Sequence, residues 1–311
     1  MGTPEFAVTS LQALVEHQYN VVAVVTQPDK PVGRHQDQLQ PSPVKQYALA
    51  HNIPVLQPVK MKDEAFLEQL RSFEADLQVV VAFRMLPEVV WSMPRFGTFN
   101  VHAALLPQYR GAAPINWAVI NGETMTGVTT FFLDKDIDTG RIIAQKQFPI
   151  PDTADVEYVY DGLMHLGAEL AMETIDAIIA GDGSIECKEQ HCYMKQGESE
   201  ETLHSAPKIF KETCEIWWNQ PAKQVYDFIR GLSPYPGSWT TLNEEGHKPT
   251  VMKVFKTAKT QQPSVGEPGT LYIEKNHLYM NTADYLLELL VVQLAGKKRM
   301  EAKAFLNGWK A

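Results

Sequence analysis

The stretch that decides the fold is TFNVHAALLPQYRGAAPIN, residues 98–116, because it reads as a strand, a bend and a helix in direct succession. Residues 98–106 are rich in apolar side chains, as a buried strand is. Pro107 and Gly111 are typical of a bend, and a helical pattern begins near Ala113. A strand that passes through a bend into a helix is the building unit of an open sheet covered by helices.

The same alternation of strands and helices runs through the first half of the chain. Further strands are expected at 20–28, 53–58, 77–83, 127–133 and 141–150, and further helices at 63–73 and from about 156 to 180. Residues 77–83, LQVVVAF, form an unbroken apolar run, which is typical of a strand buried on both faces. This order predicts an α/β fold with a doubly wound, mainly parallel, Rossmann-type sheet. Such a sheet binds ligands at the carboxyl ends of its strands.

The composition changes after the long helix. Residues 184–206 are mostly polar and lack an apolar period, which indicates a linker. Short strand-like segments interrupted by turn signals follow, and they predict a smaller C-terminal OB-like β-barrel domain. The expected division is an α/β domain at 1–183, the linker at 184–206 and the β domain at 207–311.

The overall composition, 44% hydrophobic and 21% charged over 311 residues, is that of an ordinary globular protein. No apolar run approaches the roughly 18 residues of a membrane span, and no charged-then-apolar leader opens the chain, so neither a membrane nor secretion is expected. Three cysteines make a poor disulfide framework and favour a reducing, cytoplasmic compartment. Cys187, His191 and Cys192 lie close together without a second zinc-type cluster, so we expect free thiols and no metal.

Charge is unevenly distributed along the chain. The formal net charge is −9, which argues against a protein that coats nucleic acid in general. From Lys208 onward, however, 14 Lys and Arg residues stand against 10 Asp and Glu, while the part before it holds 14 and 27. This basic end, with the run Lys297, Lys298 and Arg299, favours a polyanionic partner bound by the C-terminal region. A solvated charge run is the alternative interpretation.

Asn100 and His102 are the strongest candidates for chemistry. Residues two apart in a strand share a face, so these two side chains point one way while Phe99 and Val101 point the other way. An amide can donate to an oxyanion, and an imidazole can donate to the same oxygen or move a proton. The alternative is a polar edge strand without a catalytic role.

Three alternating acids, Asp134, Asp136 and Asp138, precede a glycine. A calcium loop would need glycine and glutamate where Thr139 and Gln145 stand, so that interpretation fails. The DTG at 138–140 matches the aspartic-protease signature, but a protease needs two facing carboxylates and the chain has one copy. Asp138 is therefore either part of a solvated turn or a carboxylate that orients His102. No G-x-G-x-x-G or phosphate-cradling G-K-[ST] loop is present, so neither a nicotinamide dinucleotide nor ATP hydrolysis is expected.

Several motifs together carry a resemblance to a known family. They are MGTPEFAV (1–8), QPDKPVGR (27–34), PSPVK (41–45), NVHAALLPQYRGAAPI (100–115), DIDTGRII (136–143) and LAGKKRM (294–300). In this order and along essentially the whole chain, they resemble the methionyl-tRNA formyltransferases, a 10-formyltetrahydrofolate-dependent formyltransferase family. The resemblance implies an N-terminal formyltransferase domain and a C-terminal OB-like tRNA-binding domain. It also implies a monomer that transfers formyl from the cosubstrate 10-formyltetrahydrofolate to the amino group of methionyl initiator tRNA, for translation initiation.

The resemblance assigns roles to particular residues. Asn100, His102 and Asp138 fall on the catalytic trio; Ala104, Leu105, Leu106 and Pro107 on the folate-contacting turn; and Phe83, Arg84, Met85 and Leu86 near the pterin pocket. Arg34 and Lys45 lie in a loop that would wedge into the acceptor stem of the tRNA. In the implied reaction an amine attacks a formyl carbonyl, Asn100 and protonated His102 stabilise the oxyanion, and Asp138 holds His102 charged and helps to remove the amine proton.

The chain departs from the family pattern at three places. Ala104 stands where the family usually has serine, and the wedge loop has few fixed cations. The third departure is at the start, where a strand normally feeds the turn at Gly2 and the helix that Thr3 would cap. We expect the native protein to carry an apolar strand of six to eight residues before this turn.

Three other functions share part of this pattern. A formyltransferase that acts on a small amine such as an amino sugar would use the same trio, and a hydrolase would release formate from the same folate. If the missing strand ruins the folate pocket, the chain would be a catalytically impaired RNA- or folate-binding protein. The basic C-terminal region favours the tRNA enzyme over the sugar enzyme.

Overall fold

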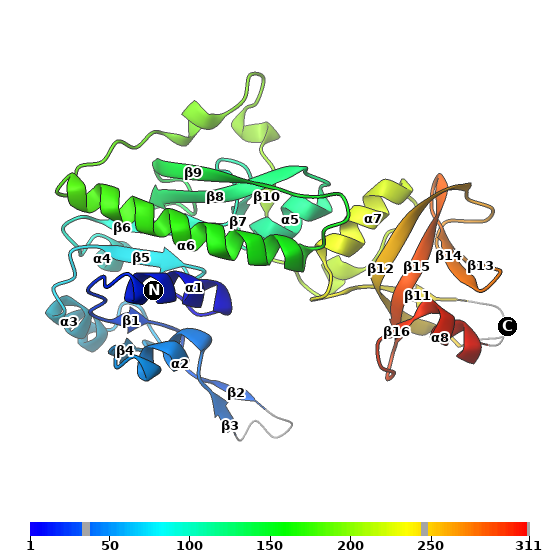
Figure 1. Cartoon of the computed structure of the whole chain (residues 1–311), viewed down its shortest axis with the longest axis horizontal. Coiled ribbons are helices and arrows are strands. Elements are labelled where there is room, and N and C mark those ends of the chain that lie inside the picture. Colours follow the sequence, from blue (N-terminus) through cyan, green and yellow to red (C-terminus); the bar gives the residue numbers. More distant parts are fainter. Residues whose placement is uncertain (33–37, 244–247, 310–311) are drawn as a thin grey trace. The chain divides into compact units, whose positions relative to one another are not determined.

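The computed structural model describes residues 1–32, 38–243 and 248–309, which pack into two units (Figure 1). Unit 1 comprises Met1–Gly111, Met125–Pro149 and Tyr160–Ser205, and unit 2 comprises Ala112–Thr124, Ile150–Val159 and Ala206–Ala311. Two short segments that precede the expected linker thus pack with the C-terminal part. The domain boundaries predicted from the sequence stay a prediction.

Unit 1 is built around a mixed sheet. Its elements are α1 (Glu5–Glu16), β1 (Val24–Val25), β2 (Lys30–Val32), β3 (Gln38–Gln40), α2 (Pro43–Ala50), β4 (Val55–Leu56), α3 (Glu64–Ser72), β5 (Gln78–Val81), α4 (Glu88–Trp91), β6 (Thr98–His102), β7 (Arg110–Gly111), β8 (Met125–Phe132), β9 (Ile142–Pro149), most of α6 (Val156–Ala180), η1 (Gln190–Tyr193) and η2 (Glu200–Thr202). Strands β5 and β6 run parallel, as do β1 and β4, whereas β8 and β9 add antiparallel strands beyond β6. The predicted α/β class is confirmed, with an antiparallel edge on the parallel sheet.

The first two residues join the two parts of this sheet. The Met1 amino group donates to the Val79 carbonyl at 2.6 Å, and the Val81 N–H donates to the Met1 carbonyl at 2.9 Å. On the other side the Gly2 N–H donates to the Val25 carbonyl at 3.0 Å, so Met1 and Gly2 lie between β1 and β5. A Cβ on Gly2 would lie 2.7 Å from the Val81 carbonyl oxygen, which explains glycine at this position. The predicted strand before Gly2 stays a prediction.

Helix α1 begins differently from the sequence-based expectation. Its N-cap is Pro4, and no side-chain hydrogen bond caps it, so the predicted cap by Thr3 is wrong. Proline at the N-cap position offers no side-chain oxygen, and the Thr3 hydroxyl is instead 3.5 Å from the Thr26 hydroxyl. The predicted helix at 63–73 does begin with a cap, because the Asp63 carboxylate accepts from the Phe66 N–H at 3.1 Å.

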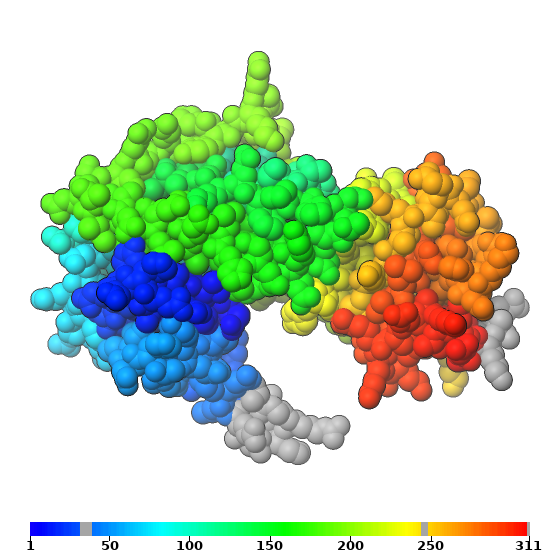
Figure 2. Space-filling model, in the orientation of Figure 1, coloured from blue at the N-terminus to red at the C-terminus, as the bar shows by residue number. Residues whose placement is uncertain are grey.

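Helices cover both faces of the sheet, and this arrangement leaves one end of β6 for a site. On one face α6 lies close to β6: a Cβ on Gly167 would lie 3.2 Å from the Val101 side chain. Helices α1 and α6 form a continuous surface there (Figure 2) and meet through the edge-on rings of Phe6 and Tyr160, 5.3 Å apart. On the opposite face Val80 joins a core with side chains of α3 and α4. Since Val80 pairs with Asn100, the Asn100 side chain lies on that second face.

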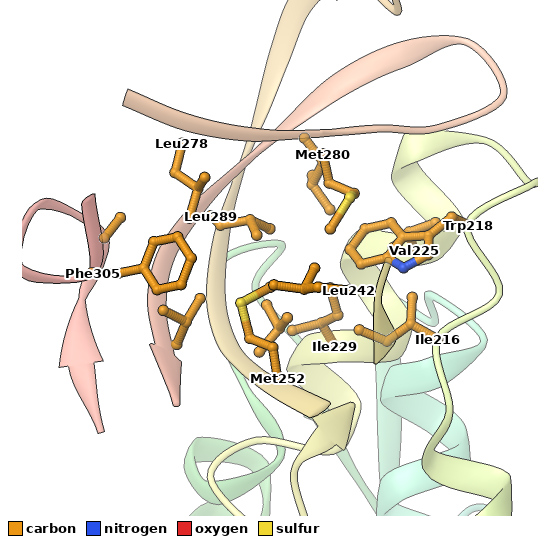
Figure 3. Close-up of a cluster of buried hydrophobic side chains, with 14 of the residues drawn as sticks. Ile216, Trp218, Val225, Ile229, Leu242, Met252, Leu278, Met280, Leu289 and Phe305 are labelled. Atoms are coloured by element: carbon orange, nitrogen blue, oxygen red, sulfur yellow. The ribbon is translucent and has the colours of Figure 1, made fainter. Parts of the chain in front are cut away.

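Unit 2 contains the predicted β domain. Its elements are α5 (Pro114–Ile120), η3 (Glu212–Cys214), α7 (Ala222–Gly231), β11 (Ser238–Leu242), β12 (Thr250–Pro263), β13 (Leu271–Glu274), β14 (His277–Asn281), β15 (Tyr285–Leu294), β16 (Met300–Glu301) and α8 (Ala302–Gly308), and β10 (Ser205–Ala206) lies at the boundary. The strands form an antiparallel sheet in the order β11-β12-β15-β14-β13, with β16 on β15. Figure 3 shows its apolar core, in which Trp218, Ile229 of α7 and Phe305 of α8 surround Met252 and Leu289 of the sheet.

We predict a pH signature for the contacts of Met1. Burial lowers the pKa of the Met1 amino group to about 5. As the pH is lowered from 8 to 5, the Met1 amino group therefore becomes protonated in the unfolded chain but not in the folded chain. The free energy of unfolding should decrease over this range, by up to about 4 kcal/mol for a pKa difference of about three units. Urea unfolding of the chain at pH 8.5 and pH 5.5 measures this loss.

The control for this prediction is the same chain preceded by an apolar strand of about seven residues. In this longer chain Met1 has an amide that does not titrate. The longer chain should therefore be more stable, and its free energy of unfolding should decrease less between pH 8.5 and pH 5.5. Equal losses for the two chains would show that the Met1 amino group is not the cause.

Candidate active site

The candidate site lies at the carboxyl end of β6. Asn100 and His102 alternate with Val101, so both lie on the face opposite α6, as the sequence predicts. His102 is only 5% exposed, whereas Asn100 is half-buried. Within the part of the chain that the structure describes, no hydrogen bond occupies the Asn100 side-chain amide. This amide is therefore free to donate to a bound substrate.

A backbone carbonyl fixes the orientation of the His102 ring. The Nε2 atom lies 2.9 Å from the Tyr109 carbonyl oxygen. A carbonyl oxygen only accepts hydrogen bonds, so Nε2 carries a proton. The other nitrogen, Nδ1, faces the Asp138 carboxylate, with 3.8 Å between Nδ1 and Oδ2. The role of Tyr109 could not be seen in the sequence, because a backbone acceptor leaves no side-chain signal.

Asp138 is held in the site by the bend that follows β6. Its Oδ2 atom accepts from the Gly111 N–H at 2.9 Å. Its backbone φ is +56°, in the left-handed region that residues other than glycine rarely adopt. The structure thus brings Asn100, His102 and Asp138 to one end of the sheet. Of the interpretations left open by the sequence, it favours a carboxylate beside His102 over a solvated turn.

The neighbouring acids shape the loop rather than the site. The Asp134 carboxylate accepts from the Thr139 hydroxyl at 2.7 Å and from the Asp136 N–H at 3.1 Å, which closes a tight turn. Asp136 itself is exposed. At the end of the loop a Cβ on Gly140 would lie 1.7 Å from the Phe132 carbonyl oxygen, so only glycine allows the loop to pass β8 at this distance.

Gln190 is a further site residue that the sequence analysis placed in a linker. Only 3% of its surface is exposed, and its side-chain amide donates to the carbonyls of Asp138 and Gly140. Nothing in the local sequence separates it from the polar residues around it. Only the tertiary contact identifies it.

The turn predicted to contact folate is tied to β8 by one threonine. The Thr129 hydroxyl donates to the Ala104 carbonyl at 2.6 Å and accepts from the Leu106 N–H at 3.1 Å. The side chains of Ala104 and Leu106 are fully buried, whereas Leu105 is half-buried. A serine at position 104 would place a hydroxyl in this buried environment, whereas alanine places only a methyl group there. Pro107 follows at the start of the bend.

The loop predicted to lie near the pterin follows β5. Leu86 and the half-buried Phe83 belong to the apolar core, and the Arg84 guanidinium donates to the carbonyls of Pro58 and Val59. Met85, by contrast, is 70% exposed. Of these four residues, Met85 presents the side chain that is most accessible to a ligand.

The residues predicted to contact tRNA belong to different units. In unit 1, the Lys45 ammonium lies 2.6 Å from the Asp29 carboxylate and lowers the pKa of Asp29. Arg34 lies outside the described residues. In unit 2, Lys297 and Lys298 are exposed between β15 and β16. The neighbouring Arg299 lies over the Phe255 ring, 3.6 Å from its centre.

The described residues contain no group of three or more His, Cys, Asp or Glu side chains that could hold a metal ion. Cys187, Cys192 and Cys214 are free thiols. No helix in the described part of the chain is both long and apolar enough to cross a membrane. The absence of a metal from the reaction stays an expectation.

Comparison with known proteins identifies the family. The Formyl transferase profile matches residues 1–175, and the profile of the formyl transferase C-terminal domain matches residues 208–310. The chain is 58% identical to the methionyl-tRNA formyltransferase of Parabacteroides distasonis, over 100% of this chain and 94% of the relative. The chain belongs to the methionyl-tRNA formyltransferase family. The relative from Bacteroides thetaiotaomicron is 55% identical over the same shares of the two chains. The resemblance seen in the sequence is thus confirmed.

Solved structures of distant relatives share the fold. The sugar 3N-formyl transferase WlaRD matches 96% of this chain and 97% of its own, with a TM-score of 0.64 and 19% identity. HypX from Aquifex aeolicus, solved with tetrahydrofolic acid, matches 83% of this chain with a TM-score of 0.57 and 19% identity, and the match spans 43% of HypX. At this identity the likeness concerns the fold alone.

We predict that Gly140→Ala damages the site through its loop. The added Cβ would lie 1.7 Å from the Phe132 carbonyl oxygen, so the loop that carries Asp138 must move. Such overpacking costs about 1–3 kcal/mol of stability, and formyl transfer should fall with it. The matched control is Gly308→Ala, where a Cβ would meet nothing within 4 Å. Thermal unfolding and turnover check both variants; a Gly140→Ala protein as active as Gly308→Ala would contradict this account of the loop.

Proposed function

We propose that this chain transfers a formyl group from 10-formyltetrahydrofolate to the amino group of methionyl initiator tRNA. One observation carries the proposal: the Asn100 amide, the His102 imidazole and the Asp138 carboxylate lie together at the carboxyl end of β6, in a member of the methionyl-tRNA formyltransferase family. Open α/β sheets bind their ligands at this end. The cytoplasmic location and the monomeric state predicted above remain part of the proposal.

The residues around the trio suit a flat, partly apolar cosubstrate. Met85 is exposed after β5, and Leu105 is half-buried after β6, so the two adjacent strands each present an apolar side chain where they end. The Asn100 amide, which has no partner among the described residues, supplies a polar group beside them. We propose that these side chains, with the backbone of residues 104–107, hold the folate.

The proposed chemistry follows from the ring orientation of His102. The amine of the aminoacyl group attacks the formyl carbon, and the bond from that carbon to the folate nitrogen breaks. Asn100 donates to the oxyanion that forms, and His102, with Nε2 committed to Tyr109, turns Nδ1 toward the reacting groups and Asp138. Asp138 accepts the proton that the attacking amine loses and passes it to the departing folate nitrogen, so the site returns to its starting state.

We predict that turnover depends on all three side chains. Removal of one oxyanion donor costs about 100-fold or more in kcat, so Asn100→Ala and His102→Ala should each lower kcat by at least about this factor. Asp138→Asn should also be slow, whereas Asp136→Asn, its exposed neighbour, is the matched control. The assay is formyl transfer to charged initiator tRNA, with charged elongator tRNA as the competing acceptor.

Other outcomes of the same assay identify the alternatives. Near-normal turnover of both alanine variants would refute the site. Formate released without an acceptor would indicate a hydrolase, and preferred transfer to an amino sugar would indicate a small-amine enzyme. Folate binding without transfer to any acceptor would indicate an impaired binding protein.

We propose that the C-terminal region from Lys208 onward binds the tRNA mainly through phosphates. The support is the excess of basic residues after Lys208 and the exposure of Lys297 and Lys298. These two lysines form no ion pair among the described residues, so their charge is available to a partner. Arg299 is less available, since it lies over Phe255 and donates to the Pro234 carbonyl at 3.3 Å.

The predicted test of this surface is its salt dependence. Each phosphate contact contributes about 0.7 to 0.9 log units of affinity per tenfold change in salt. Lys297→Ala/Lys298→Ala should therefore raise the KM for tRNA and flatten its salt slope. Lys60→Ala/Lys62→Ala, two exposed lysines of unit 1, is the matched control. If the KM for tRNA kept the salt slope of the unmodified protein, Lys297 and Lys298 would not be part of the tRNA interface.

A further inference from the structure

Gln190 uses its whole side-chain amide to connect two loops of the candidate site. Its Nε2 atom donates to the Asp138 carbonyl at 2.7 Å and to the Gly140 carbonyl at 3.0 Å. Its Oε1 atom accepts from Arg110, at 2.9 Å from Nε and 2.7 Å from Nη2. Both donors and both acceptor positions of the amide are thus occupied, which fixes its orientation. Gln190 is also the first residue of η1, far from both loops in the sequence.

The loop that Gln190 holds is costly to maintain. The positive φ of Asp138 is an unfavourable conformation for a residue other than glycine and persists only where the surroundings enforce it. The two hydrogen bonds from Gln190 fall on the carbonyl of Asp138 and on that of Gly140, two residues later. Just beyond them, Ile142 and Lys188 exchange backbone hydrogen bonds of 2.8 and 2.9 Å. Residues 188–190 therefore hold the end of the loop that carries Asp138 in place through hydrogen bonds.

The other loop holds the partner groups of the catalytic side chains. Arg110 lies between Tyr109, whose carbonyl accepts from His102, and Gly111, whose N–H donates to the Asp138 carboxylate. The Arg110 guanidinium is bound by Gln190 on its inner side and by the exposed Glu200 carboxylate, at 2.8 Å, on its outer side. Through Arg110, the amide of Gln190 thus sets the spacing between the loop that orients His102 and the loop that carries Asp138.

We propose that Gln190 is a positioning residue for formyl transfer, which holds the Asp138 carboxylate at its place beside His102. This inference rests on the proposed function of the site. Gln190 touches neither substrate in the proposal and acts through Asp138 and Arg110. Its removal should therefore lower kcat and leave substrate binding unchanged.

The first test is Gln190→Ala. A misplacement of about 1 Å at a reacting group can cost about 100-fold in rate, so we expect kcat to fall by roughly this factor. The KM values for folate and for charged tRNA should stay within about twofold of those of the unmodified protein. The variant loses the correct placement of the Asp138 carboxylate, which acts in the transition state and not in substrate binding. Glu200→Ala is the matched control, because it removes a contact of Arg110 on the solvent side; it should keep the unmodified kcat.

A double-mutant cycle separates positioning from a general structural effect. In an Asp138→Asn background there is no carboxylate left to position, so adding Gln190→Ala should lower kcat little further. If Gln190 only stabilises the fold, the second change should lower kcat by the same factor in both backgrounds. Equal factors would therefore overturn the inference.

Gln190→Glu keeps the test valid if the alanine variant fails to fold. Glutamate has the same shape and still accepts from Arg110, but it lacks the N–H groups that bind the two carbonyls. It should fold, as thermal unfolding can check, and show the same loss of kcat. Unmodified turnover of Gln190→Glu or of Gln190→Ala, with Asp138→Asn slow, would overturn the positioning role alone. Unmodified turnover of Asp138→Asn would overturn the proposed site as well.

Discussion

The structure of unit 1 depends on the alternation of side chains along β6. This strand lies between β5 and β8, so its backbone is paired on both edges and its residues must point to one face or the other. Phe99 and Val101 point to the face that α6 covers, where apolar burial holds the helix in place. Asn100 and His102 therefore have to point to the opposite face. A shift of β6 by one residue would exchange these sets and remove both the core and the site.

The polar groups at the end of β6 are tolerated because they are paired. The Thr129 hydroxyl accepts from Leu106 and from the Gln145 amide and donates to Ala104, and it is fully buried. The His102 ring and the Gln190 amide are similarly enclosed and similarly bonded. A buried polar group without a partner costs about 1–3 kcal/mol, so these hydrogen bonds avoid that cost while they fix the orientation of the three side chains. The Asn100 amide differs from them, because it is half-buried and has no hydrogen-bond partner among the described residues.

Much of this arrangement could be predicted from the sequence, and the exceptions have physical reasons. The period-two pattern of β6 placed Asn100 and His102 on one face, and the strand order placed their end of the sheet at the ligand-binding edge. The contribution of Tyr109 could not be predicted, because any residue type has a carbonyl. That of Gln190 could not be predicted either, since its partners lie between 50 and 80 residues away in the sequence. The Thr3 cap failed because helix propensity rules do not decide which of two adjacent residues becomes the N-cap.

In a polypeptide of residues 1–311 alone, the contacts of Met1 and Gly2 have a consequence for the cooperativity of unit 1. Strands β1 and β4 pair only with each other in the described part of the sheet, and Met1 and Gly2 connect them to β5 through one peptide group and the Met1 amino group. Such a seam is where local opening begins, because few hydrogen bonds must break for one part to separate from the rest. The backbone amides of β1 and β4 should therefore exchange their hydrogens with solvent faster than those of β5, β6 and β8. The sheet of this polypeptide can therefore open locally at β1 and β4 while the central strands keep the hydrogen bonds that hold His102 and Asp138.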